Sequence, residues 1–104
     1  MTPIQIYLGV PQTVKIPVYE AQQGYRTTIK QMIFSNTDAA DAKITVTLNT
    51  VDIMKDFVVK TGETQIINVT VVLNQNDRLS LQQEKQNAIN VMISGDTELI
   101  TTSY

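Results

Sequence analysis

The sequence predicts an all-β fold, in which about eight short antiparallel strands form a single β-sandwich with jelly-roll or immunoglobulin-like topology. Val, Ile and Thr make up 37 of the 104 residues, and such β-branched side chains suit a pleated strand better than a helix. Apolar residues alternate with polar ones in short runs, and turn-forming residues separate these runs. This rhythm is typical of sandwiches and barrels.

The length predicts one domain that spans residues 1–104. A chain of this size buries roughly 60–70% of its unfolded surface, so it can form one core without disulfides. No apolar run approaches the ~20 residues of a membrane span. The first residues contain neither a basic nor an apolar stretch, so no signal peptide is expected.

The first three strands are expected at residues 4–8, 14–18 and 25–35. In the first, alternation predicts that Ile4, Ile6 and Leu8 share the core face. Pro17 cannot donate a backbone hydrogen bond, so the second strand is expected to be broken or to lie at a sheet edge. In the third, the apolar positions shift partway along, which predicts a β-bulge or a change of face near Gln31.

The next three strands are expected at residues 43–49, 51–60 and 65–73. In the first of these, alternation predicts that Thr45 and Thr47 face out, where they are expected to form solvated strand surface. Residues 51–60 also have apolar positions at helical spacing, but their β-branched end favours a strand. In the third, Ile66 and Val72 lie opposite the main apolar face, which predicts that both faces are partly covered. Gly62, in the turn between the last two strands, is expected to take a positive φ.

The last strands are expected at residues 79–81 and 89–93. The polar residues 82–88 between them are predicted to form a loop or a helical turn. Gly95 and Asp96 are expected to end the final strand. Residues 98–104 are predicted to form either a short edge strand or a frayed tail.

The composition excludes several classes of function. The chain has no Cys, no His and no Trp, so it offers no thiolate nucleophile, no imidazole base and no zinc site built on Cys or His. The net charge is −2 and the eight Lys and Arg residues are scattered, which argues against a nucleic-acid partner. We predict no catalytic residue, no metal and no cofactor.

Carboxylates and amides in turns are the remaining chemical groups of interest. Close carboxylate pairs that could act as acid and base are Asp52 with Asp56, Asp38 with Asp41, and Asp96 with Glu98. Oxygen ligands for a calcium ion could come from Asn36, Asp38 and Asp41, or from Asn74, Asn76 and Asp77. Turn formation and solvation are the preferred interpretation for all of these residues, because Asn and Asp bond their own backbone in turns.

The second half of the chain carries a pattern of strand and turn residues. Its segments are Lys55-Asp56, Gly62-Glu63-Thr64, Val71-Val72-Leu73-Asn74, Asp77-Arg78-Leu79 and Asn87-Ala88-Ile89-Asn90-Val91, preceded by an extended segment from Ile29 to Thr37. This pattern resembles that of small β-sandwich structural proteins of tailed bacteriophages. Where that family usually has Gly after Leu-Asn, this chain has Gln75-Asn76, and Asn tolerates the left-handed conformation that the turn needs.

The resemblance implies a virion structural protein of the tail, baseplate or capsid-decorating type, with no catalysis. Such a protein would be made in the host bacterial cytoplasm and would act by assembly with other phage structural proteins. It would be a homo-oligomer, with a trimer as one arrangement that suits attachment to fibres.

Four tyrosines are the candidate partner contacts, since Tyr combines an apolar ring with a polar tip: Tyr7, Tyr19, Tyr25 and Tyr104. Their alternative role is to cap the edge of the core.

Two functions compete with virion assembly. One is a carbohydrate-binding or host-receptor-binding module of a phage, which would recognise surface glycans through loop Asn, Gln, Asp and Tyr. The other is a hydrolase that uses carboxylates such as Asp52, Asp56 and Glu63.

Overall fold

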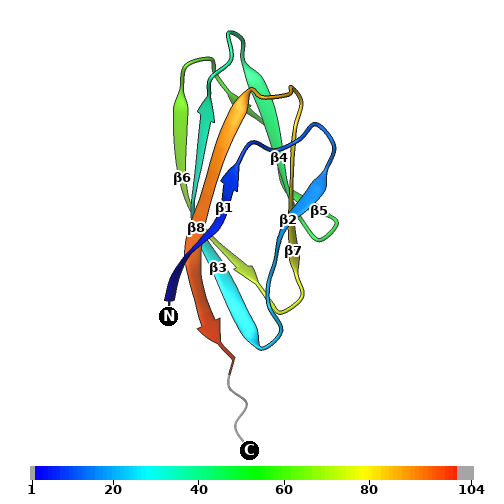
Figure 1. The fold of residues 1–104 in the computed structure, drawn as a ribbon, viewed down its shortest axis with the longest axis vertical. Coiled ribbons are helices and arrows are strands. Elements are labelled where there is room, and N and C mark those ends of the chain that lie inside the picture. Colours follow the sequence, from blue (N-terminus) through cyan, green and yellow to red (C-terminus); the bar gives the residue numbers. More distant parts are fainter. Residues whose placement is uncertain (1, 101–104) are drawn as a thin grey trace, which may run out of the picture.

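Eight antiparallel strands form two four-stranded sheets that pack face to face (Figure 1). The computed structural model describes residues 2–100. The strands are β1 (Thr2–Gly9), β2 (Ile16–Glu20), β3 (Tyr25–Asn36), β4 (Ala42–Leu48), β5 (Val51–Val59), β6 (Thr64–Leu73), β7 (Arg78–Gln83) and β8 (Ile89–Leu99). The prediction of an all-β sandwich of eight strands is therefore confirmed, including a strand rather than a helix at β5.

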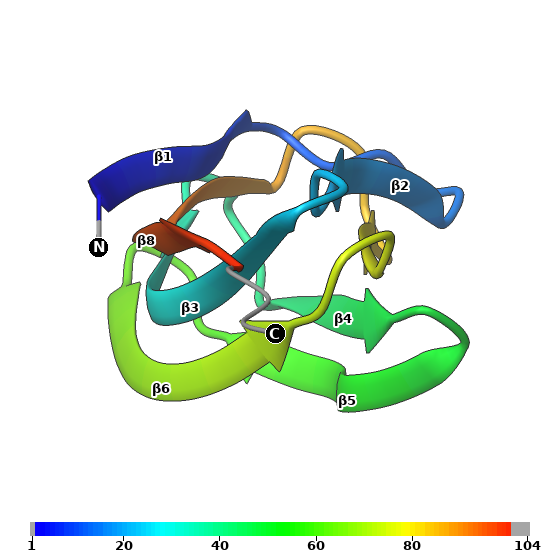
Figure 2. The same cartoon turned by 90° about the horizontal axis from the view of Figure 1, so that it is seen from below.

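The strand order distinguishes between the two predicted topologies. The first sheet has the order β1-β8-β3-β6, and the second sheet has the order β2-β7-β4-β5. Strands therefore pair as first with eighth, second with seventh, third with sixth and fourth with fifth. This is the pairing of a long hairpin wrapped around itself, which is the jelly-roll arrangement. Figure 2 shows the two sheets end-on, with β6 and β5 along one open side of the sandwich and β1 and β2 along the other.

The core lies between the two sheets and consists mainly of branched aliphatic side chains. Its largest fully buried apolar members are Phe34, Ile29, Met32, Ile44, Leu73, Leu79, Leu81, Ile89 and Ile93. Phe34 of the first sheet meets Phe57 of the second, with ring centroids 5.8 Å apart and planes inclined by 52°. Tilted aromatic pairs at this distance are favourable beyond the area that they bury.

Two predicted irregularities are present. β2 is an edge strand, and its register with β7 shifts between Pro17 and Tyr19. The register of β3 with both its neighbours shifts between Ile29 and Gln31, so the bulge near Gln31 is confirmed. Gly62 has the expected positive φ, 74°.

The predicted face of Leu8 is wrong. The register of β1 with β8 shifts between Gln5 and Tyr7, and a one-residue insertion moves every following side chain to the other face. Tyr7 consequently packs against the core, while Leu8 points outward and is 66% exposed. The second strand also begins later than predicted, at Ile16, which leaves Val14 before it and 65% exposed.

Two predictions about exposure also need correction. Thr45 and Thr47 lie on the outer face of the second sheet, as predicted, but they are buried rather than solvated, and their hydroxyls form hydrogen bonds with Asp56 and Asp52 of β5. Ile66 and Val72 are 59% and 43% exposed, because within residues 2–100 nothing packs on that face of the edge strand β6.

Gly95 does not end the last strand, which continues to Leu99. A Cβ at this position would lie 1.9 Å from the Thr28 carbonyl oxygen, so the glycine permits close approach of two strands rather than a turn.

Residues 84–88 form a loop. Of the predicted tail, Glu98 and Leu99 belong to β8, whereas residues 101–104 lie outside the described residues. Within residues 2–100, no helix has the length and apolar character to cross a membrane.

Candidate interaction surface

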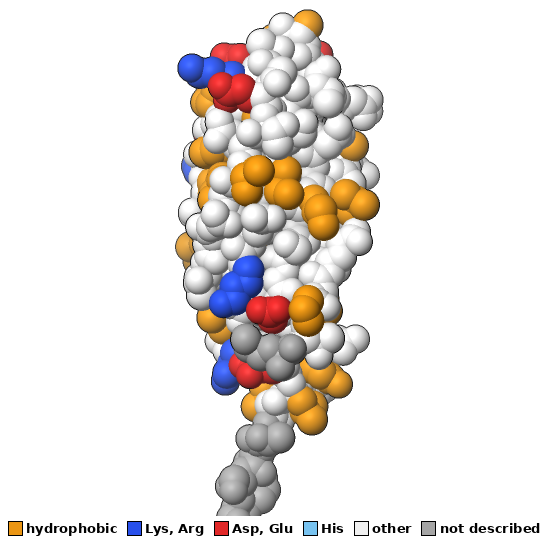
Figure 3. Space-filling model, turned by 90° about the vertical axis from the view of Figure 1, so that its left-hand side faces the viewer, with side chains coloured by type: hydrophobic (Ala, Val, Ile, Leu, Met, Phe, Trp, Pro, Cys, Tyr) orange, Lys and Arg blue, Asp and Glu red, His pale blue; other side chains and the backbone are white. Residues whose placement is uncertain are grey.

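An apolar row runs across the outer face of the first sheet. Leu8 of β1 is paired with Met92 of β8, Met92 with Ile33 of β3, and Ile33 with Ile66 of β6. Three of the four are exposed, by 66% for Leu8, 37% for Met92 and 59% for Ile66, and Ile33 is half-buried. These four residues are called the apolar row. Figure 3 shows apolar side chains gathered across the middle of this face, with charged groups nearer its two ends.

Polar rows border the apolar row on both sides. The row toward one end of the sheet contains Asn90, Ser35 and Thr64. The row toward the other end contains Gln5, Ser94, Gln31 and Asn68. An apolar centre with a polar rim is the usual composition of a protein–protein contact surface.

A shallow hollow of about 390 Å³ lies beside the apolar row, at the end of β1. Leu8, Met92 and Ile33 line one part of it, and Gly9 and Val10 line another. Val10 is itself 42% exposed. The apolar surface therefore includes a depression that a side chain from another molecule could enter.

The outer face of the second sheet is built differently. The corresponding cross-strand row contains Pro17, Ser80, Thr47 and Asp52, and it is called the polar row. Asp52 accepts hydrogen bonds from the Thr47 hydroxyl, at 2.7 Å, and from the Lys15 ammonium, at 3.0 Å. These hydrogen bonds, above all the one from Thr47, lower the pKa of the Asp52 carboxyl. The Asp52 carboxylate and the Thr47 hydroxyl are thus paired within the molecule.

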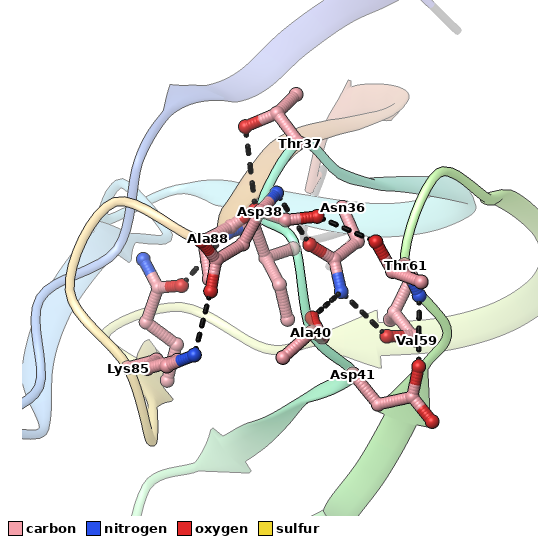
Figure 4. Close-up of polar contacts among 11 residues, drawn as sticks. Asn36, Thr37, Asp38, Ala40, Asp41, Val59, Thr61, Lys85 and Ala88 are labelled. Atoms are coloured by element: carbon pink, nitrogen blue, oxygen red, sulfur yellow. Dashed lines mark hydrogen bonds and ion pairs between the residues drawn. The ribbon is translucent and has the colours of Figure 1, made fainter.

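The loops at one end of the sandwich are joined by Asn36, which is 2% exposed (Figure 4). Its amide nitrogen donates to the carbonyls of Ala40 and Val59, at 3.0 and 2.8 Å. Its side-chain oxygen accepts from the Asp38 backbone nitrogen at 2.8 Å. The side chain therefore holds the end of β3 against the following loop and the end of β5.

The carboxylates near Asn36 serve the same loops. Asp38 accepts a hydrogen bond from Lys85 at 2.8 Å, and this bond is the main reason that the pKa of Asp38 is lowered. Asp41 accepts from the Thr61 backbone nitrogen at 2.9 Å. The predicted oxygen donors of this loop are thus near one another, and each is used as a hydrogen-bond acceptor for a turn or a neighbouring loop.

The second predicted group of oxygen donors is also occupied by turn contacts. Asp77 accepts hydrogen bonds from the Asn74 backbone nitrogen and from the Asn49 side chain, at 2.9 and 3.2 Å. Asn76 has a φ of 71°, as the turn requires. In residues 74–77 the Asp77 carboxylate therefore holds the turn, and Asn76 supplies its positive φ.

The predicted carboxylate pairs are not combined in a cleft. On β5, Asp52 belongs to the polar row, and Asp56 occupies an irregular position with a φ of 51°. On β8, Glu98 forms an ion pair with Arg26 at 3.1 Å. Glu63 accepts a hydrogen bond from Gln65 at 2.8 Å. Among residues 2–100, no cluster of three or more acidic side chains could hold a metal ion.

Three of the four predicted tyrosines can be placed. Tyr7 and Tyr19 pack against the core, and partial burial raises the pKa of Tyr7. The Tyr19 and Thr27 hydroxyls are hydrogen-bonded at 3.0 Å. Tyr25 lies near Tyr19, in a hollow that also involves Gln22 and Thr97. Tyr104 lies outside the described residues. These tyrosines are remote in the sheets from the apolar row, except for Tyr7, which precedes Leu8.

The apolar row was not predicted from the sequence. Its members are far apart in the chain, and they become neighbours only through the register of four strands. The available signal in the sequence was Ile66, an apolar residue that shares its face of the strand with the polar residues Thr64 and Asn68. No protein-family model and no curated protein sequence matches the chain. Its function must therefore be argued from its own residues.

Proposed function

We propose that the protein is a non-enzymatic structural component of a tailed-bacteriophage virion, and that it acts by protein–protein assembly in the tail, in the baseplate or on the head. The observation that carries the assembly role is the apolar row with its polar rims. In this proposal the row is covered by another structural protein of the particle, whose apolar side chains enter the hollow beside Leu8. The chain is made in the host bacterial cytoplasm before it is assembled.

The virion setting is supported by the residues of the phage-like pattern. Four of the six residues with positive φ within residues 2–100 fall in that pattern or its turns: Asp56, Gly62, Asn76 and Asn87. The pattern thus describes how strands and turns alternate along this chain. Jelly rolls also occur in viral capsid domains, and this second support is an analogy of fold alone.

The test combines detection with localisation. Mass spectrometry of purified particles should find the chain in stoichiometric amount. Leu8→Ser with Met92→Ser should then reduce incorporation into particles by at least tenfold. The matched control is Val14→Ser with Ile53→Ser, because these residues are 65% and 41% exposed but lie outside the row. Absence of the chain from particles, or equal incorporation of both variants, would contradict the proposal.

The hollow at Tyr25 favours a second candidate function, the binding of a host surface glycan. It has a volume of about 390 Å³ and combines the rings of Tyr19 and Tyr25 with the polar groups of Gln22 and Thr97. Aromatic rings with a few polar groups are typical of small-ligand sites. Binding on a glycan array that is lost in Tyr25→Ala would support this function, and no binding at millimolar glycan would exclude it.

A further inference from the structure

The four edge strands of the sandwich differ in how well they are protected against pairing with another chain. An edge strand presents unpaired backbone groups, and proteins usually protect it with proline, charge, bulges or short length. β1 contains Pro3 and a register shift. β2 has five residues, with Pro17 and a second shift. β5 contains three charged residues and two shifts.

β6 has almost none of these protections. It has ten residues, none of them charged and none of them proline. Its one protection is a register shift with β3, where Val69 and Thr70 both lie opposite Lys30, and Figure 2 shows that the strand curves. The alternation of exposed and less exposed residues nevertheless continues unbroken from Thr64 to Leu73. Within residues 2–100, β6 makes no backbone hydrogen bond outside its ladder with β3.

We infer that the free edge of β6 pairs with β6 of a second copy of this chain, antiparallel and about a two-fold axis at Val69. This inference goes beyond the proposed function, because it does not depend on the virion setting. The two first sheets would become one continuous eight-stranded sheet. Addition of a strand to a free sheet edge is a recurrent mode of recognition, and two-fold dimers are the commonest homo-oligomers.

The sequence of β6 is self-complementary in this register. Ile66 then lies opposite Val72 of the partner subunit, and Asn68 lies opposite Thr70 of the partner subunit. Apolar residues therefore meet apolar residues on the outer face, and polar residues meet polar ones, which is the favourable arrangement for cross-strand pairs. A shift of two residues in either direction would place Ile66 opposite a polar residue, either Thr70 or Asn74.

The pairing also continues existing surfaces. Ile66 ends the apolar row, and it is the most exposed apolar residue of β6, at 59%. On the inner face, Ile67, Val69 and Val71 pack against the core but are only half-buried. A second copy would cover both sets. A pair formed mainly by strand edges is smaller than a standard stable interface, so a dissociation constant on the order of 10–100 µM is expected.

The test is sedimentation velocity over a dilution series of the full chain. Two variants carry like charges at opposed positions: Asn68→Lys with Thr70→Lys, and Asn68→Glu with Thr70→Glu. Each alone should weaken dimerisation at least tenfold, and an equimolar mixture of the two should restore it, because opposite charges then face each other. Gln5→Lys with Gln86→Lys adds the same charge at exposed positions away from β6 and should leave dimerisation unchanged.

Hydrogen exchange provides a second readout on the unmodified chain. Backbone amides in residues 64–73 should become better protected as the protein concentration rises, while those of β2 should not. If a double variant does not fold, Thr70→Lys and Thr70→Glu provide the same charge test singly. A chain that is monomeric at every concentration, or a dimer that the charged variants leave intact, would overturn the inference. Neither outcome bears on incorporation into particles, which tests the proposed function separately.

Discussion

The two outer faces of the sandwich use the same four-strand geometry for opposite purposes. On the second sheet, the polar row is completed from within, since Thr47 and Lys15 both bind Asp52. On the first sheet, the apolar row remains exposed at Leu8 and Ile66. An outer face whose groups are satisfied internally contributes to stability, whereas an apolar face left open in the free chain is available for a partner. The difference suggests separate experiments for each face.

The largest effect is expected for Gly95→Ala, which would disturb the pairing of β8 with β3, the two central strands of the sheet that carries the apolar row. The added Cβ would lie 1.9 Å from the Thr28 carbonyl oxygen, so the backbone would have to move. We expect a loss of about 3 kcal/mol of stability, measured by urea denaturation. The neighbouring change Ser94→Ala is the control and should cost less than about 1 kcal/mol. A loss below 1 kcal/mol in Gly95→Ala would show that the strands can separate easily.

A smaller effect is expected for Thr47→Val in the polar row. Thr47 is 1% exposed, and its hydroxyl donates to Asp52 at 2.7 Å. Loss of a hydrogen bond to a charged group should cost about 1.5 kcal/mol. Thr28→Val is the comparison on β3, a central strand of the first sheet, where the Thr28 side chain is only half-buried. Thermal unfolding should show little change there, and equal losses at both positions would remove the contrast between the faces.

Asp52 of the polar row and Asp38 of the loop after β3 should make stability sensitive to acid. The folded-state pKa of Asp52 and that of Asp38 are lowered, whereas an unfolded Asp titrates at about 3.9. Their contribution is therefore fully present above about pH 5 and is lost as the pH falls through the folded-state pKa values. Between about pH 5 and 8 stability should be nearly constant, because the chain contains no His.

Asp52→Asn tests the origin of that acid sensitivity. Thermal melts between about pH 5 and 2 should show a shallower loss of stability in this variant than in the unmodified chain. Leu8→Thr, in the apolar row, should leave the acid profile unchanged. An unaltered profile in Asp52→Asn would mean that other carboxylates account for the acid sensitivity.

The smallest effect is expected for Leu8→Thr on stability itself. Leu8 is 66% exposed and lies outside the core, so the change should stay within about 0.5 kcal/mol. The measurement is the same urea titration as for Gly95→Ala. A loss well above this value would indicate that the apolar row stabilises the free chain, and its availability for a partner would then be doubtful.

Local residue chemistry was sufficient to predict much of the fold. β-Branched composition predicted the strands, Pro17 predicted an irregular edge strand, and Gly62 predicted a turn with positive φ. The face of Leu8, the burial of Thr47 and the role of Gly95 were predicted wrongly. Each depends on how distant strands are paired, and a one-residue bulge reverses the face of all that follows. The apolar row could not be predicted for the same reason, because it exists only across four paired strands.

Oxidative footprinting of the protein, free and assembled in purified particles, tests the central claim most directly. Hydroxyl radicals label exposed side chains, and the two sets to compare are Leu8 and Met92 on the apolar row and Val14 and Ile53 elsewhere, all exposed in the free chain. We expect labelling of the row to fall several-fold on assembly, while the other set is labelled as before. Equal labelling of the row in free and assembled protein, or protection confined to the second set, would contradict the claim.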